Sequence, residues 1–415
     1  MKKHIFISIH YMHVGGAEIS LIGLLQALDP EKADVDLFVY SHEGYLMTCI
    51  PEYVNLLPEI KSYSMLERPM VEVLSKGHLG VLAARLWSKH LASNYIKKRK
   101  ITKENSVGMG YLGKYFNKIV PDINPSVTYD LAISFLIPHN IVLDHVKAKK
   151  KICWIHTDYS NVKINQEVEF PVWSRYDYIA SISSRVTNSF IKIFPSLKNK
   201  IIEIENILSP DFVRKRAEEY IITNFEGDIN LLSIGRFCEA KNYDNIPDIC
   251  KRMLTILKSK ANENENINKK LSSTLPLSLK WYIIGFGPDE ELIHQKIAEA
   301  GMQEHVIILG KKENPYPYIK ACDIYVQPSR YEGKSVTVRE AQMLCKPVVV
   351  TNYPTASSQI EDGVDGVIVP LDNDGCAKGL ADFILDKAKQ KEIDSYLKKH
   401  DYGNIKETEK IYELL

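Results

Sequence analysis

The stretch SRYEGKSVTVREAQMLCKPVVVTNYPTASSQIEDGVDGVIVP, residues 329–370, decides the fold. An apolar run ends at residue 329, and two further Val-rich runs follow at 347–351 and 366–370. The spacing between them predicts a loop and then a helix over about 335–344. Because the apolar runs are continuous rather than alternating, they predict strands that are covered on both faces, as in a parallel sheet flanked by helices.

The same alternation of short apolar runs and helical segments extends along the whole chain. Further runs lie at 4–10, 35–40, 130–135, 151–156, 178–183, 201–206, 229–235, 279–285, 305–310 and 323–329. They predict an α/β protein with two doubly wound, Rossmann-like domains facing a central cleft. We expect these domains at 1–222 and 229–385, with helices from about 390–415 packing back on the first. The polar segment 259–276 is expected to be a surface loop.

Composition narrows the function classes. The chain has 415 residues, 45% of them hydrophobic, and a formal net charge of +1, which argues against nucleic-acid binding. Its seven cysteines show no metal-ligand spacing, as expected in a reducing compartment. The sequence shows no targeting signal and no 18-residue apolar span, so we expect a cytoplasmic protein, with peripheral attachment to the inner face of the cell membrane as an option.

The predicted helix at 335–344 begins where a strand has just ended, so its free N–H groups face the ligand edge of the sheet. A diphosphate suits such a helix end. Gly333 lets the backbone approach closely, and Ser335 is expected to cap the helix. Glu332 and Glu340 can each accept hydrogen bonds from vicinal hydroxyls. The alternative is a solvated helix with ordinary surface glutamates; a Walker-type phosphate loop is excluded because Pro328 stands where it needs glycine.

Two cations follow the predicted strand at 229–235. Arg236 offers a planar fork of donors and Lys241 a point charge, a combination suited to a departing diphosphate. Such a pair removes the need for a divalent metal. The two D-x-D spacings, at 34–36 and 372–374, fall in a buried strand and a turn, so we expect no metal site and no cofactor. The alternative is two surface cations in a polar loop.

The first half of the chain contributes weaker candidates. Gly15 and Gly16 follow the first strand, a signal that any tight strand-to-helix turn can give, and they lack the G-x-G-x-x-G dinucleotide fingerprint. His156 ends another strand, where a neutral imidazole can bond a sugar hydroxyl or stabilise an oxocarbenium-like transition state. A lone histidine is also commonly structural. Glu313 follows a predicted strand in the second half of the chain. We expect it to line the cleft; the alternative is an ordinary turn residue.

Four motifs occur in an order that resembles family 4 retaining glycosyltransferases, which have the GT-B fold. Residues 332–340 look like the family's E-x7-E signature, and HVGGAEISLIGLLQAL (13–28) resembles its N-terminal glycine loop and helix. SIGRFCEAKNYD (233–244) and IIGFGPDEELI (283–293) resemble its G-R-x4-K-N and G-x-G-P segments. The match covers about 1–28 and 150–370.

The resemblance implies a retaining transfer from a nucleotide sugar to a saccharide acceptor. We expect this transfer to be metal-independent, with a UDP-linked donor, a hexose or N-acetylhexosamine as the transferred sugar, and a role in surface-polysaccharide biosynthesis. The resemblance assigns the ribose to Glu340, the transferred sugar to Glu332, and sugar and phosphate to the backbone at 333–335. The catalytic set is Glu332, Arg236, Lys241 and His156, and the donor-binding set is Gly15, Gly16, Gly333, Lys334, Ser335, Glu340 and Glu313. Lys334 stands where the family commonly has an apolar residue, which puts sugar identity in doubt.

Residues 76–118 carry ten Lys or Arg and a single acid, interleaved with Leu, Tyr and Trp. Within this stretch, 79–100 predicts a basic amphipathic helix suited to an anionic membrane surface, which favours a lipid-linked saccharide acceptor. The alternative is the solvated face of a helical hairpin. No nucleic-acid partner is expected.

Two other functions fit the same two-domain build. One is a non-catalytic nucleotide-sugar-binding protein, and the other is a phosphorylase or sugar-nucleotide epimerase. Product analysis separates them from a transferase.

Overall fold

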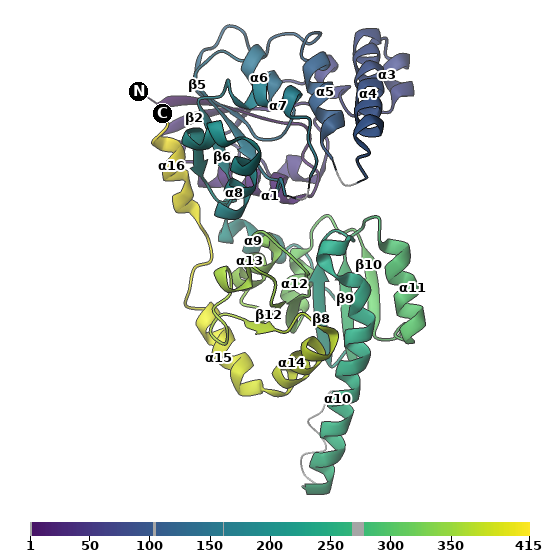
Figure 1. Cartoon of the computed structure of the whole chain (residues 1–415). Helices are drawn as coiled ribbons and strands as arrows, with labels where there is room; N and C mark the ends of the chain where they lie inside the picture. Colours follow the sequence, from purple (N-terminus) through teal and green to yellow (C-terminus); the bar gives the residue numbers. More distant parts are fainter. Residues whose placement is uncertain (1, 103–104, 161, 268–277) are drawn as a thin grey trace. The chain divides into compact units, whose positions relative to one another are not determined.

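The computed structural model describes residues 2–102, 105–160, 162–267 and 278–415, without the side chains of 262–267. The chain folds into two compact units (Figure 1). The first comprises Met1–Ser209 and Asn404–Leu415, and the second comprises Pro210–Gly403. The second unit thus begins at Pro210, earlier in the chain than the expected boundary between residues 222 and 229.

The first unit is built on a seven-stranded parallel sheet of order β3-β2-β1-β4-β5-β6-β7. Its strands are β1 (Lys3–Ile9), β2 (Ala33–Val39), β3 (Asn55–Leu56), β4 (Tyr129–Ser134), β5 (Ala148–Ile155), β6 (Tyr178–Ser181) and β7 (Ile201–Glu203). Its helices include α1 (Gly16–Ala27), α2 (Lys61–Ser64), α3 (Met70–Ser75), α4 (Leu79–Arg99), α5 (Val107–Phe116), α6 (Asn140–His145), α7 (Gln166–Trp173) and α8 (Ser184–Ile193).

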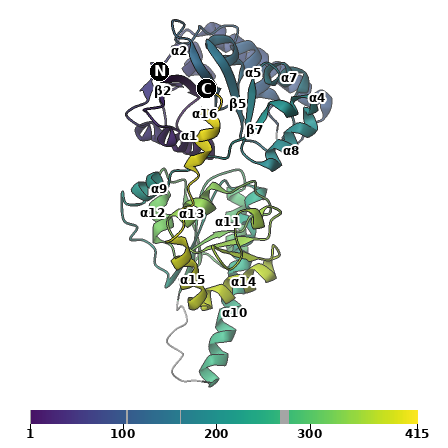
Figure 2. The same cartoon turned by 90° about the vertical axis from the view of Figure 1, so that its left-hand side faces the viewer.

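The C-terminal segment belongs to this first unit. Helix α16 (Glu409–Tyr412) lies close to the amino-terminal strand, and Figures 1 and 2 show the two chain ends near each other. Several hydrogen bonds hold the segment. Among them, the Asp29 amide donates to the Tyr412 hydroxyl at 2.6 Å, Lys3 Nζ donates to the Leu415 carbonyl at 2.6 Å, and the Leu208 amide donates to Asn404 Oδ1 at 2.9 Å. Helix α15 (Lys387–Leu397) stays in the second unit.

The second unit has a six-stranded parallel sheet of order β10-β9-β8-β11-β12-β13. Its strands are β8 (Ile229–Ile234), β9 (Leu279–Ile284), β10 (Val306–Gly310), β11 (Ile324–Gln327), β12 (Val348–Thr351) and β13 (Val367–Val369). Its other helices are α9 (Pro210–Ala217), α10 (Ile246–Ile267), α11 (Glu290–Ala300), α12 (Tyr316–Ala321), α13 (Val336–Met343) and α14 (Asn373–Leu385).

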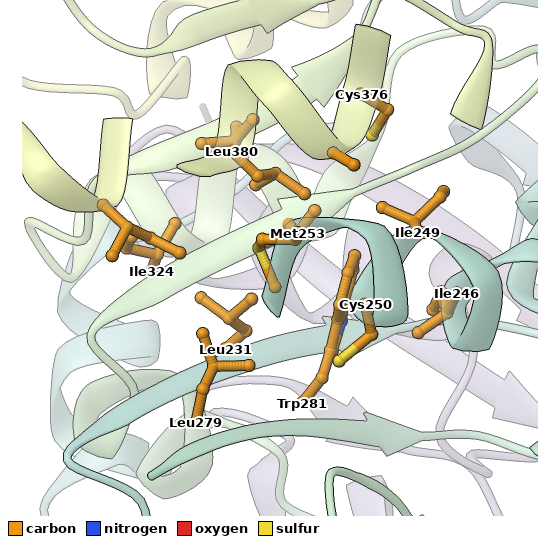
Figure 3. Close-up of a cluster of buried hydrophobic side chains, with 14 of the residues drawn as sticks. Leu231, Ile246, Ile249, Cys250, Met253, Leu279, Trp281, Ile324, Cys376 and Leu380 are labelled. Atoms are coloured by element: carbon orange, nitrogen blue, oxygen red, sulfur yellow. The ribbon is translucent and has the colours of Figure 1, made fainter. Parts of the chain in front are cut away.

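The core of the second unit lies between this sheet and helices α10 and α14. Figure 3 shows Met253 and Cys250 of α10 against Trp281 of β9, with Leu380 of α14 close by. The only polar atom of the Trp281 ring, Nε1, donates to Ser233 Oγ at 2.9 Å, which removes the cost of burying it. Apolar packing on this face fixes the helices and leaves the carboxyl ends of the strands to polar loops.

The expected α/β class with two doubly wound parallel sheets is confirmed: every strand predicted from the apolar runs is present. One local prediction is wrong. Residues 259–267, expected in a surface loop, continue helix α10, because this segment contains Lys, Ala and Glu and neither Gly nor Pro. The remainder of that predicted loop, 268–276, lies outside the described residues.

Candidate functional site

Each sheet has one switch point, where the chain's progress across the sheet reverses direction. In the second unit it lies between β8 and β11, the neighbouring strands from which the chain moves outward to opposite edges. Ligands of doubly wound sheets bind beyond the carboxyl ends of the strands at such a point. The loops that follow these strands, residues 235–245 and 328–335, contain the predicted Arg236, Lys241 and Glu332.

Lys241 and Glu332 are in direct contact. Lys241 Nζ lies 2.6 Å from Glu332 Oε1, and both side chains are largely buried, at 19% and 12% exposure. The same carboxylate oxygen accepts from Ser329 Oγ at 2.6 Å and from Gln327 Nε2 at 3.2 Å. Three donors therefore fix this carboxylate at the switch point, and the ammonium is held beside it.

A second ion pair ties the two loops together. Arg330 donates from Nη1 and Nη2 to the two Asp244 carboxylate oxygens, at 3.0 and 2.8 Å. Nη1 also donates to the Glu239 carbonyl at 2.6 Å, and the Arg330 amide donates to the Ala240 carbonyl at 2.8 Å. These bonds surround the short 3-10 turn Glu239–Lys241, so Arg330 fixes the backbone from which Lys241 extends.

Glu340 lies in the middle of α13 and is 1% exposed. Its Oε1 accepts a hydrogen bond of 2.7 Å from the Tyr316 hydroxyl of α12. Burial raises the pKa of the Glu340 carboxyl to about 7, and the Tyr316 bond opposes that shift only in part. The group therefore changes charge near neutral pH.

The start of α13 differs from the sequence expectation. Ser335 stands at the N-cap position but its hydroxyl makes no capping hydrogen bond, so the predicted cap is wrong. The side chain of Gln359 instead binds the backbone at this helix start: its Oε1 accepts from the Ser335 amide at 3.0 Å, and its Nε2 donates to the Ser335 carbonyl at 2.6 Å. Ahead of Ser335, Lys334 is half-buried, and a Cβ at Gly333 would meet no atom within 4 Å in the described part of the chain.

The glycines of the two other motif loops have a steric role. A side chain at Gly285 would collide with the Gly235 carbonyl, and one at Gly287 with the Phe237 carbonyl. At Gly235 a Cβ would lie 2.8 Å from the Tyr243 hydroxyl and 3.0 Å from Lys241 Cε. The loops after β8 and β9 therefore pack backbone to backbone at Gly285 and Gly287, whereas the side chains of Tyr243 and Lys241 take the space beside Gly235.

The remaining predicted residues of this unit lie farther out. Arg236 is exposed at the beginning of the loop after β8. Glu313 is also exposed, and it follows the edge strand β10, which β9 separates from β8. Its neighbour Asn314 is buried and donates to the Arg216 carbonyl at 2.8 Å. The structure thus brings Lys241, Glu332 and the Ser329–Ser335 loop together, and places Glu313 two strands away.

The first unit holds Gly15, Gly16 and His156. The two glycines follow β1, one of the switch-point strands of that sheet, and a Cβ at Gly15 would collide with the Glu18 carboxylate. His156 follows β5 and lines a pocket of about 270 Å³. The pocket is lined by Asn105, Ser106, Met109, Leu136, Ile137, His139, Trp154, Ile155, His156, Thr157, Tyr159, Val162 and Trp173.

Three buried nitrogens around this pocket have no hydrogen-bond partner in the described chain: His139 Nε2, Trp154 Nε1 and His156 Nε2. Burial lowers the pKa of His156 to about 4 and that of His139 to about 3. Both imidazoles are therefore neutral at pH 7. His139 is fixed by a 2.8 Å bond between its Nδ1 and Ser134 Oγ, which leaves Nε2 unpaired.

Among the described residues, no three His, Cys, Asp or Glu side chains come together as a metal site would require.

Comparison with known proteins finds a family match in the second unit. Residues 215–400 match the model of the family "Glycosyl transferases group 1". This stretch is therefore similar to group 1 glycosyltransferases. It contains Lys241, Glu332, Glu340 and the whole switch point of the second sheet.

Curated relatives match parts of the chain. An uncharacterized glycosyltransferase of Methanocaldococcus jannaschii is 26% identical over 40% of this chain and 37% of its own length. The N-acetylgalactosamine-N,N'-diacetylbacillosaminyl-diphospho-undecaprenol 4-alpha-N-acetylgalactosaminyltransferase of Campylobacter jejuni is 26% identical over 52% of each chain. The alignments thus span about a third to a half of these relatives.

Solved structures share the fold across the full chain. TarM of S. aureus, in a complex that contains UDP, has a TM-score of 0.64 at 14% identity, covering 99% of both chains. Anabaena HepE with UDP and glucose has a TM-score of 0.62 at 14% identity, covering 99% of this chain and 98% of its own. The two units therefore have the GT-B architecture, as expected from the sequence.

Proposed function

We propose that the protein is a glycosyltransferase that moves a hexose or N-acetylhexosamine from a nucleotide sugar, UDP-linked by preference, to a saccharide acceptor in surface-glycan biosynthesis. The observation that carries the proposal is the Lys241–Glu332 pair, 2.6 Å apart at the switch point of a domain similar to group 1 glycosyltransferases. That point is where a doubly wound sheet binds its ligand.

Lys241 and Arg236 are proposed to neutralise the donor diphosphate. Negative charge develops on the leaving oxygen as the glycosidic bond breaks, and a fixed cation in a partly buried loop stabilises it without reorganisation. Lys241 meets this condition because Glu332 and the Arg330–Asp244 pair hold it in place. With two cations available, the transfer needs no divalent metal.

The two glutamates are proposed to position the donor at its two ends. Glu332, fixed by Ser329 and Gln327, is an acceptor for hydroxyls of the transferred sugar. Glu340 is an acceptor for the ribose hydroxyls and requires its ionised form for this role. Because burial places its pKa at about 7, donor affinity should rise with pH through neutrality.

The transfer is proposed to retain anomeric configuration, as the resemblance to family 4 implies. The acceptor hydroxyl attacks from the face that the diphosphate leaves, and a donor phosphate oxygen takes its proton. His156, neutral and with an unpaired Nε2, would bond a hydroxyl of a bound sugar. Gly15 and Gly16 would let the loop after β1 approach the phosphates.

The donor and acceptor classes rest on the relatives. The solved HepE and TarM complexes contain UDP, which supports a uridine donor. The Campylobacter relative is named for a diphospho-undecaprenol saccharide, and a Rhizobium meliloti relative for lipopolysaccharide core biosynthesis. A lipid-linked saccharide acceptor is proposed on this basis.

The deciding experiment incubates the protein with a panel of UDP-, GDP-, ADP- and CMP-sugars and extracted lipid-linked saccharides in EDTA, then follows products by mass spectrometry and NMR. A new α-linked product from an α-linked donor, with release of the nucleoside diphosphate, supports the proposal. Donor binding without transfer or hydrolysis would identify a binding protein. A sugar phosphate product would identify a phosphorylase, and an epimerised donor an epimerase.

A further inference from the structure

We propose that helices α3 and α4 and the adjacent Ile119 form a docking surface for an anionic lipid bilayer. We call these elements the α3–α4 surface. The inference goes beyond transferase activity and does not depend on it, because it concerns where the protein resides rather than what its switch point binds.

The first observation is a stripe of apolar side chains on the outer face of α4. Leu79 is 63% exposed, Leu86 is 50% and Trp87 is 51%. Leu79 and Leu86 are seven residues apart and Trp87 follows, so the three share one side of the helix. The buried residues Val81, Ser88 and Ala92 occupy the opposite side.

The second observation is that neighbouring elements extend this stripe. Val71 and Leu74 of α3 are 80% and 54% exposed, while Val73 between them is fully buried. Val73 and Val81 of α4 belong to one core cluster, so the exposed sides of both helices face away from that core. Figure 1 shows α3 beside α4. Ile119, 42% exposed, lies beside α4: its Cδ1 is 3.9 Å from a Cβ built at Gly80.

A soluble monomer rarely exposes so many large apolar side chains in one place. The described part of the chain has 13 exposed large hydrophobic side chains, and six of them belong to the α3–α4 surface.

The third observation is the charge around the stripe. Helix α4 carries no acid in its 21 residues, and its exposed face continues into Lys97 and Lys98, with Lys89 at its side. The nearest acid on α3, Glu72, is paired with Lys76 at 2.7 Å. An apolar stripe with basic flanks complements a bilayer interface with anionic headgroups, where Trp and Leu enter the acyl boundary and lysines stay at headgroup level.

Some residues of the basic stretch 76–118 stabilise the fold and do not belong to the docking surface. Arg85 points inward and donates to the carbonyls of Met65 and Arg68, and burial lowers the pKa of its guanidinium. Phe116 is fully buried in the same core. The surface is therefore narrower than residues 76–118, and it also includes α3. No helix in the described ranges is long and apolar enough to cross a bilayer.

The test is co-sedimentation of the full chain with phosphatidylcholine vesicles that contain or lack phosphatidylglycerol. Binding to the anionic vesicles that weakens with added salt is expected. Tryptophan emission provides a second readout. Trp87 is the exposed one of the four tryptophans, since Trp154, Trp173 and Trp281 are at most 3% exposed, so its entry into lipid shifts the emission to the blue. Trp87→Phe should retain binding and lose most of the shift.

Two double variants locate the contact. Leu86→Gln/Trp87→Gln and Lys97→Glu/Lys98→Glu should each lower the vesicle partition coefficient by at least about tenfold. Their matched controls, Ile221→Gln/Leu292→Gln and Lys258→Glu/Lys391→Glu, change exposed residues of the second unit and should bind as the wild type does.

Failure of the wild type to bind anionic vesicles at low salt would overturn the proposal, as would equal losses in the controls. Self-association that depends on Leu86 and Trp87 but not on lipid would overturn it too, by assigning the surface to a second copy of the chain. Transfer to a water-soluble acceptor should be unchanged in the surface variants, which separates this inference from the proposed function.

Discussion

The strand ends of the two units hold their polar groups in opposite states. In the second unit, Lys241 and Glu332 are charged and paired, and Ser329 and Gln327 complete the hydrogen bonds of the carboxylate. In the first unit, the pocket near the end of β5 has neutral imidazoles and unpaired buried nitrogens. The ion pair of the second unit, held by hydrogen bonds, suits a diphosphate. The neutral, aromatic pocket of the first unit suits the uncharged hydroxyls of a saccharide.

This comparison predicts that removing a charge from the second unit has the largest effect on catalysis. Lys241→Ala should lower kcat for glycosyl transfer by at least about a hundredfold, because the leaving diphosphate loses its fixed cation. Steady-state kinetics with the preferred donor measures the loss. Lys280→Ala is the matched control: that lysine lies at the start of β9, the opposite end of the same sheet, and should leave kcat within about twofold. Equal kcat values in both variants would remove Lys241 from the mechanism.

Glu340 should make the stability of the second unit depend on pH. Its pKa is raised by burial to about 7 from an unfolded value of 4.5, so the stability it gives is full below 4.5 and is lost as the pH rises through 7. The loss amounts to about 3 kcal/mol of unfolding free energy for the second unit. Glu340→Gln should remove this part of the pH dependence in urea titrations, whereas Glu313→Gln, at an exposed site, should preserve it. Parallel pH curves for wild type and Glu340→Gln would show that folding does not raise the pKa of this carboxyl.

Substitution of His156 tests the role of the neutral pocket in the first unit. His156→Phe removes the nitrogen but keeps the aromatic bulk, and should lower kcat/KM by about tenfold through a lost hydrogen bond to a sugar hydroxyl. Because the wild-type imidazole is neutral above about pH 5, the loss should be the same from pH 6 to 9. The exposed His400 provides the control His400→Phe. A loss that appears only on one side of neutrality would indicate that His156 acts as an acid or base.

Arg330 is expected to have the smallest effect, since it acts through Lys241. Arg330→Ala should lower kcat/KM by roughly fivefold. Asp244→Asn should do the same, and the double variant should be no worse than either single one. Additive losses in that double-mutant cycle would mean that the two residues do not act as a pair.

Much of the fold could be predicted because it depends on local apolar patterns. Each buried Val- or Ile-rich run became a strand, and the helix predicted at 79–100 differs from the structure by a single residue at its C-terminal end. The extension of α10 into a polar segment is not predicted by the apolar pattern, because low apolar content is also typical of a surface loop. Helix propensity without glycine or proline is sufficient to continue a helix that packing has already started.

The site could be predicted only in part. The motifs located Lys241 and Glu332, but the contact between them joins residues 91 positions apart. Arg330–Asp244, 86 positions apart, and Tyr316–Glu340 were missed for the same reason: a single sequence does not reveal which distant side chains meet. The cap supplied by Gln359 in place of Ser335 is a further tertiary effect that local propensity cannot anticipate.

The most direct test of the account is calorimetric titration of the protein with UDP in EDTA, comparing wild type, Lys241→Ala and Lys280→Ala. We expect metal-free binding by the wild type and by Lys280→Ala, and at least about tenfold weaker binding by Lys241→Ala. Equal UDP affinity in all three proteins would contradict it, because the switch point of the second sheet would then not hold the donor diphosphate.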